Sequence, residues 1–84
     1  MKKGILWFTT EWHSTNETID TTMRRLGQDG IDIRKIDTDK NEQQTTAYDV
    51  ENIPTIIIAN VDTGVELKRF IGVKSYEEIT EMLK

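Results

Sequence analysis

Two short apolar runs constrain the fold of this chain more than any other feature of its sequence. Gly4–Phe8 reads Gly-Ile-Leu-Trp-Phe and shows no alternation of apolar and polar residues. Thr55–Ala59 reads Thr-Ile-Ile-Ile-Ala, and its β-branched side chains make it the strongest β signal in the sequence. Strands without alternation are typical of a sheet that is covered on both faces. The two runs therefore predict a buried sheet with helices on both sides.

A helix is expected after the first run, starting near Ser14. Ser14 and Glu17 have the spacing of a capping box, in which hydroxyl and carboxylate bond to each other's backbone N–H groups. Gly27 or Gly30 is expected to end this helix. An apolar stripe at positions i, i+4 and i+7 consists of Ile19, Met23 and Leu26. The stripe predicts that one side of the helix packs on the sheet.

The rest of the chain supplies two more strands and two more helices. We expect strands at 31–37 and 66–71, a short surface helix within 39–48 and a last helix over 75–83. Asp62-Thr63-Gly64 predicts a tight hairpin turn, with glycine where the backbone needs a positive φ. The order β-α-β-α-β-β-α predicts that residues 1–84 form a single α/β domain. Its mixed four-stranded sheet would carry helices on both faces.

Composition narrows the classes of function. The 84 residues carry 11 Lys and Arg against 15 Asp and Glu, a net charge of -4. An acidic surface repels phosphate groups, so we expect no binding to nucleic acid and none to membrane surfaces. The apolar run after Met1-Lys2-Lys3 is too short for a signal peptide or a spanning helix. We therefore predict a cytoplasmic protein, with a monomer as its expected state.

The absence of cysteine excludes whole classes of chemistry. With 0 Cys, the chain forms no disulfide, thiolate nucleophile, iron–sulfur cluster or cysteine zinc site. Its single histidine, His13, stands next to Ser14, but adjacent side chains at a loop–helix junction rarely face each other. One histidine also falls short of the three or four ligands typical of a metal site. We expect no catalytic residue, no cofactor and no metal.

Four local motifs, in this order along the chain, resemble the thioredoxin family. They are Phe8-Thr9-Thr10-Glu11-Trp12, Ile53-Pro54-Thr55, Asp62-Thr63-Gly64-Val65 and Phe70-Ile71-Gly72. The resemblance implies the thioredoxin-like fold, with the order of elements given above and a cis peptide bond at Pro54. The family's extra N-terminal strand and helix are absent, so the length is similar to that of glutaredoxins or phage-encoded thioredoxins.

The chain departs from the family pattern where the family has its Cys-x-x-Cys. His13-Ser14-Thr15-Asn16 stands there, so His13 and Asn16 occupy the positions of the two cysteines. Many thioredoxins also carry a buried carboxylate in the first strand and a lysine near it. The corresponding residues here are Trp7 and Ile33. This loss of the proton-handling groups favours a natural relative without redox activity over a laboratory substitution.

The resemblance also implies a substrate groove. Its residues in this sequence are Trp12, His13, Ser14, Thr15, Ile53, Pro54 and Gly72. We predict a redox-inactive thioredoxin-like protein that binds a protein or an extended peptide in this groove. One alternative is a thioredoxin- or glutaredoxin-type disulfide reductase whose cysteines at positions 13 and 16 have been replaced. Another is a structural subunit in which the groove has no function.

Overall fold

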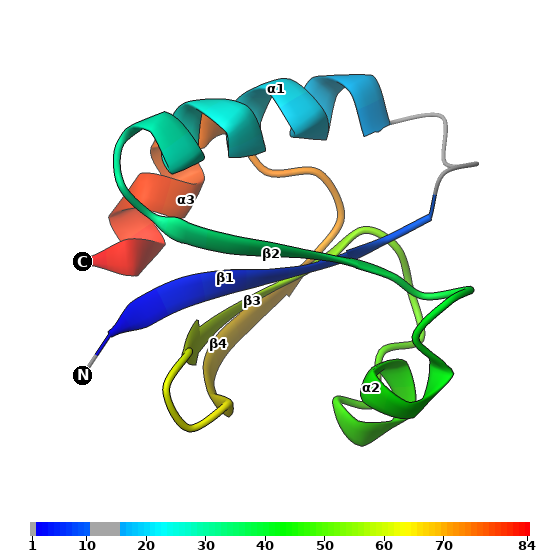
Figure 1. Ribbon diagram of the computed structural model, residues 1–84. Helices are drawn as coiled ribbons and strands as arrows, with labels where there is room; N and C mark the ends of the chain where they lie inside the picture. Colours follow the sequence, from blue (N-terminus) through cyan, green and yellow to red (C-terminus); the bar gives the residue numbers. More distant parts are fainter. Residues whose placement is uncertain (1, 11–15) are drawn as a thin grey trace.

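The computed structural model describes residues 2–10 and 16–84. Its elements are β1 (Lys3–Thr9), α1 (Asn16–Gln28), β2 (Asp32–Asp37), α2 (Glu42–Ala47), β3 (Thr55–Asn60), β4 (Val65–Ile71) and α3 (Tyr76–Leu83). Figure 1 shows the strands as one layer, with α1 and α3 on one side and α2 on the other. The predicted order of elements and the helices on both faces of the sheet are confirmed.

The four strands form one mixed sheet in the order β2-β1-β3-β4. β1 lies in the interior, parallel to β2 and antiparallel to β3. At the C-terminal end of β1, Phe8 faces Ile36 of β2 and Thr55 of β3. Thr55 in turn faces Ile71 at the end of β4. One end of the sheet therefore gathers the last residues of β1, β2 and β4 and the first residue of β3.

Two apolar clusters, one on each face of the sheet, hold the layers together. On the side of α1 and α3 the buried residues are Ile5, Trp7, Ile19, Met23, Leu26, Ile56, Ile58, Phe70 and Ile79. On the side of α2 they are Leu6, Phe8, Ile36, Ile57 and Ala59. Consecutive residues of β1 point to opposite faces and are buried on both, as the missing alternation predicted.

The ends of the helices agree with the predicted signals in part. Ser75 caps α3 in the predicted capping box: its hydroxyl accepts from the N–H of Glu78, and the Glu78 carboxylate accepts from the N–H of Ser75. The cap predicted at Ser14 lies outside the described residues. Gly27 is part of α1, and Gly30 takes a left-handed conformation beyond its end, with φ 93°. None of the helices in the described part of the chain is long and apolar enough to span a membrane.

The predicted surface helix within 39–48 is shorter than expected. It begins only at Glu42, because the preceding residues form a turn in which the Asp37 carboxylate accepts from the N–H of Asp39 at 2.9 Å. A local Asp turn of this kind competes with helix formation. The predicted hairpin turn is present between β3 and β4, where Gly64 has φ 80°.

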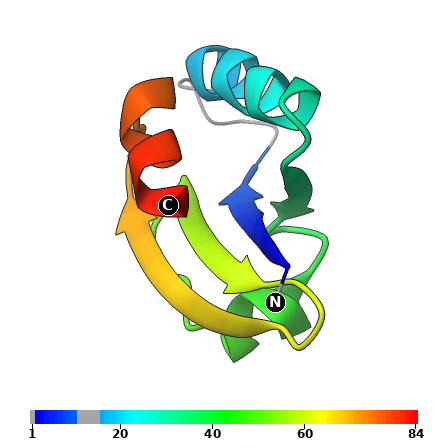
Figure 2. The same cartoon turned by 90° about the vertical axis from the view of Figure 1, so that its left-hand side faces the viewer.

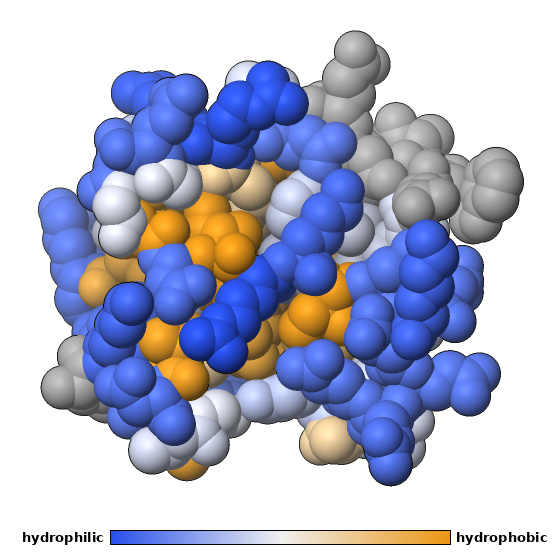
Figure 3. All heavy atoms as spheres, in the orientation of Figure 1, coloured by the Kyte–Doolittle hydropathy of each residue, from blue (hydrophilic) through white to orange (hydrophobic). Residues whose placement is uncertain are grey.

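The two edge strands of the sheet differ in character. β2 exposes Arg34 and Lys35, and Asp32 forms ion pairs of 3.6 Å with Arg34 and with Lys2. Figure 3 shows hydrophilic side chains across the face where β2 lies, with apolar atoms visible between them. β4, on the opposite edge, exposes Val65, Leu67 and Ile71. β4 also exposes Glu66 and Lys68, so this edge is mixed, with more exposed apolar side chains than the β2 edge.

Candidate functional site

The Pro54 segment and the chain after β4 meet at the end of the sheet. The Ile53–Pro54 peptide bond is cis. The N–H of Gly72 donates a hydrogen bond of 2.8 Å to the carbonyl oxygen of Pro54. Gly72 has φ 96°, a left-handed conformation that favours glycine. Pro54 is buried, whereas Ile53 and Gly72 are half-buried, so this junction reaches the surface.

Two exposed apolar side chains flank this junction. Ile71 is 54% exposed and Val73 is 40% exposed, on either side of Gly72. Large apolar side chains gathered beside an accessible backbone are typical of a binding surface. The motif Phe70-Ile71-Gly72 includes Ile71, but neither Ile71 nor Val73 was predicted from the sequence to lie at the groove. The sequence shows an apolar residue on each side of Gly72. This pattern indicates an exposed surface only once β4 is known to lie at the edge of the sheet.

The predicted groove is described in part. Gly72 and Pro54 are joined by their backbone hydrogen bond, with Ile53 directly before Pro54, next to the Phe8–Thr55 pair at the end of β1. Asn16 is the first residue of α1. The other predicted groove residues, Trp12, His13, Ser14 and Thr15, lie outside the described residues.

A cavity lined by polar residues lies at the same end of the sheet, beside β2. It has a volume of about 220 Å³ and is lined by Thr9, Thr10, Lys35, Asp37 and Lys40. The Lys35 ammonium group lies 3.7 Å from the Asp20 carboxylate and 4.9 Å from the centre of the Trp7 ring. A cation over an indole face is attracted by the ring quadrupole. Lys35 therefore lies close to Trp7, even though Ile33 occupies the position where the resemblance puts the family's lysine.

Trp7 itself occupies the place where the resemblance puts a carboxylate. Its side chain is 4% exposed and belongs to the core cluster on the side of α1 and α3. Its Nε1–H has no hydrogen-bond partner in the described part of the chain. An indole in this apolar surrounding does not titrate, so Trp7 cannot take up or release a proton as a carboxylate does. Within the same described residues, no three His, Asp or Glu side chains form a group that could hold a metal.

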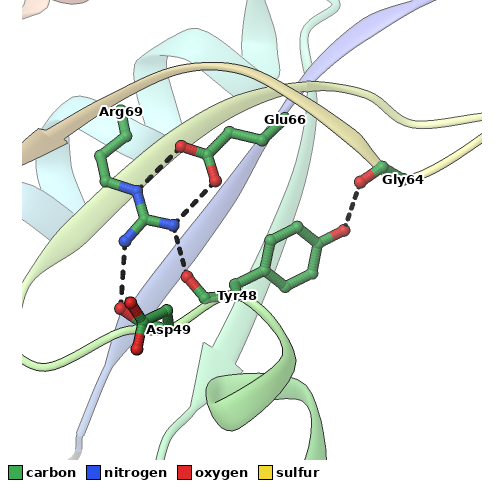
Figure 4. A network of polar contacts seen from close by, with 5 residues as sticks. All are labelled: Tyr48, Asp49, Gly64, Glu66 and Arg69. Carbon is green, nitrogen blue, oxygen red and sulfur yellow. Dashed lines mark hydrogen bonds and ion pairs between the residues drawn. The ribbon is translucent and has the colours of Figure 1, made fainter.

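Arg69 anchors the chain that leads toward Pro54. Figure 4 shows its guanidinium between β4 and the C-terminal end of α2. It donates to the carbonyl oxygens of Tyr48 and Asp49, and through Nε and Nη2 to both carboxylate oxygens of Glu66, at 2.9 and 2.7 Å. The Tyr48 hydroxyl donates to the carbonyl oxygen of Gly64 at 2.6 Å. The segment after α2 is thus tied to β4 and to the hairpin turn.

The same contacts shift the pKa of Glu66. The hydrogen bond from Arg69 lowers this pKa below its usual value, while partial burial opposes the shift. The Arg69–Glu66 pair is bidentate, the geometry in which guanidinium and carboxylate bond most strongly. Because the pair stands on β4 and the bonded carbonyls lie at the end of α2, it links β4 to the segment that leads to Pro54.

Comparison with known proteins identifies the family that this architecture resembles. The thioredoxin family model matches residues 2–84. No curated protein sequence matches the chain. Among solved structures, thioredoxin 1 from Thermosipho africanus is 26% identical, with a TM-score of 0.81 over 99% of this chain and 90% of that one. The germline-specific thioredoxin Deadhead from Drosophila melanogaster is also 26% identical, with a TM-score of 0.85 over 98% and 78% of the two chains.

A third similar structure agrees in fold at lower identity. A mutant thioredoxin from Halobacterium salinarum is 18% identical, with a TM-score of 0.88 over 96% of this chain and 71% of that one. The match of the family model over nearly the whole sequence agrees with the fold and with the motifs around Pro54 and Gly72. The chain therefore belongs to the thioredoxin family, as a member that contains no cysteine.

Proposed function

We propose that this thioredoxin-family domain binds an extended segment of a partner protein, without thiol–disulfide exchange. The groove would consist of Trp12, His13, Ser14, Thr15, Ile53, Pro54 and Gly72, with Ile71 and Val73 beside it. Exchange requires a thiolate that attacks a disulfide sulfur, and a chain with 0 Cys supplies none. Binding by contrast requires only backbone groups and apolar contacts, both of which remain at this end of the sheet.

The observation that carries the proposal is the exposure of Ile71 and Val73 next to the bonded pair Gly72 and Pro54. An extended peptide can pair with backbone groups in the manner of an added strand, while its alternate side chains enter pockets beside it. Here the backbone at Ile53 would supply the pairing, and the two exposed apolar residues would contact alternate side chains.

A display library of random linear peptides tests the proposal directly. We expect selected peptides to lose binding by at least ~10-fold, about 1.4 kcal/mol, with Trp12→Ala or Val73→Ser. The reason is that Val73→Ser removes an exposed apolar side chain beside the groove, and Trp12→Ala removes the aromatic residue that the family resemblance assigns to it. Val65→Ser is the matched control, because Val65 is 57% exposed but stands at the opposite end of β4.

The outcome separates the groove from other surfaces. Isothermal titration with the selected peptides should show unchanged affinity for the Val65→Ser variant. Peptides that bind Trp12→Ala and Val73→Ser as tightly as the parent protein would place recognition on another face. A library that yields no binder at all would favour a structural subunit without groove function.

The alternative function is tested by restoring the family's cysteines. The double variant His13→Cys/Asn16→Cys should reduce insulin disulfides above the background of the parent. Its rate should stay roughly 100-fold below that of a thioredoxin with a buried carboxylate, because Trp7 offers no general base. Asn16→Cys alone is the control, since one thiol cannot resolve a mixed disulfide. Full thioredoxin activity in the double variant would revive the view that this chain is a disulfide reductase with replaced cysteines.

A further inference from the structure

In the described part of the chain, the exposed large apolar side chains are concentrated near one edge of the sheet. Among residues 2–10 and 16–84, the exposed large apolar side chains are Val65 (57%), Leu67 (40%), Ile71 (54%) and Val73 (40%). Three of them belong to β4, which Figure 2 shows at the free edge of the sheet below α3. An edge strand with unpaired backbone groups and apolar side chains is a template for a further strand.

The register between β3 and β4 assigns the side chains of β4 to the two faces of the sheet. A β-bulge between Ile58 and Ala59 makes Leu67 an extra residue on β4. Glu66 and Arg69, which face residues of the α2-side cluster, therefore lie on the same face. Val65 and Phe70 lie on the other face, on the side of α1 and α3.

We propose that β4 pairs antiparallel with β4 of a second copy of this chain. In the proposed register Glu66 faces the partner's Arg69, and Val65 faces the partner's Phe70. Both pairs join residues on the same face of the sheet, as antiparallel pairing requires, and both occur twice because the interface is two-fold symmetric. A register with Lys68 directly opposite the partner's Lys68 would set Val65 against Ile71, which lies on the opposite face of the sheet.

A cavity beside β4 offers a second reason for this occupant. It has a volume of about 290 Å³ between β4 and α3 and is lined by Arg69, Phe70, Lys74, Glu78 and Met82. In the proposed register the partner's Val65, opposite Phe70, lies over the mouth of this cavity. The most exposed apolar side chain of the described residues then covers Phe70 and Met82, once in each copy.

The proposed interface is short, so we expect the two copies to associate weakly. Six residues of β4, Val65–Phe70, pair in each copy, and the bulge and Lys68 limit tighter packing. Interfaces of small area are typical of weak, transient association. We therefore expect dimers at high protein concentration only, which departs from the monomer expected from the sequence.

Single-cysteine cross-linking tests the register, because the chain has no cysteine of its own. The symmetry axis falls between residues 67 and 68, so the two copies of Leu67→Cys lie next to each other. The two copies of Ile71→Cys lie seven positions apart, about 24 Å at ~3.4 Å per residue. Under mild oxidation we expect Leu67→Cys to form disulfide-linked dimers at least ~10-fold faster than Ile71→Cys. Ile71 is the more exposed residue, so random collisions would give the reverse order.

Sedimentation velocity tests the association itself, over about 10 µM to 1 mM protein. We expect the mass to rise from one chain toward two, and Val65→Asp to raise the dimer dissociation constant at least ~10-fold. Val73→Asp, which follows β4 and lies outside the paired residues, is the matched control and should leave the constant unchanged. A single-chain mass at every concentration overturns the proposal, as does faster cross-linking through residue 71. A dimer lost with Val73→Asp but kept with Val65→Asp overturns it as well, because the interface would then lie at the groove.

Discussion

Trp7→Ala is expected to lower the free energy of unfolding by about 3–5 kcal/mol, the range typical of a buried aromatic residue changed to alanine. Trp7 is 4% exposed and belongs to the core cluster that joins β1, β3, β4, α1 and α3. Its removal leaves a cavity that a close-packed interior cannot fill. Because a domain of this size has only about 5–10 kcal/mol of stability in total, a large fraction of the variant should be unfolded near 40 °C.

Urea denaturation followed by far-UV circular dichroism measures this loss without relying on tryptophan fluorescence. Val65→Ala serves as the control, because Val65 is 57% exposed and its change should stay within about 0.5 kcal/mol. A loss below about 1 kcal/mol for Trp7→Ala would mean that the indole does not pack in the core as described.

Arg69→Met should cost about 2–3 kcal/mol of stability. Arg69 is the donor to the carbonyl oxygens of Tyr48 and Asp49 and the partner of Glu66. Methionine keeps much of the apolar stem but none of these hydrogen bonds, and bonds with charged groups contribute about 1.5–3 kcal/mol. Lys68→Met, on the same strand and exposed, should change stability by less than about 0.5 kcal/mol. Equal losses for the two variants would show that the network contributes nothing.

The stability difference between the parent and Arg69→Met should depend on pH. Arg69 lowers the folded-state pKa of Glu66 below the ordinary value of 4.5. The resulting stabilisation is present above pH 4.5 and is lost as the pH falls through the lowered pKa, because Glu66 then becomes protonated in the folded state as well. Urea midpoints between about pH 7 and about pH 3 should therefore converge toward the acid end. If the difference stays constant over this range, Arg69 stabilises the fold through its other hydrogen bonds and not through Glu66.

The sequence by itself determined the order and type of the elements. The apolar runs Gly4–Phe8 and Thr55–Ala59 and the cap at Ser75 are local signals. Each depends only on residues close to it in the sequence. The motif around Pro54 and the absence of cysteine are likewise properties of the sequence alone, and they led to the thioredoxin family and to the loss of its chemistry.

The tertiary structure alone decided which surfaces those elements present. Ile71 reads as an ordinary strand residue, yet it is 54% exposed because β4 lies at the edge of the sheet. Arg69 reaches the end of α2 only through folding, since its bonded carbonyl at Tyr48 lies 21 residues away. The bulge that places Val65 and Phe70 on one face also arises from pairing with β3. The physical reason is that exposure and long-range hydrogen bonds depend on which strands become neighbours, and no local periodicity specifies that.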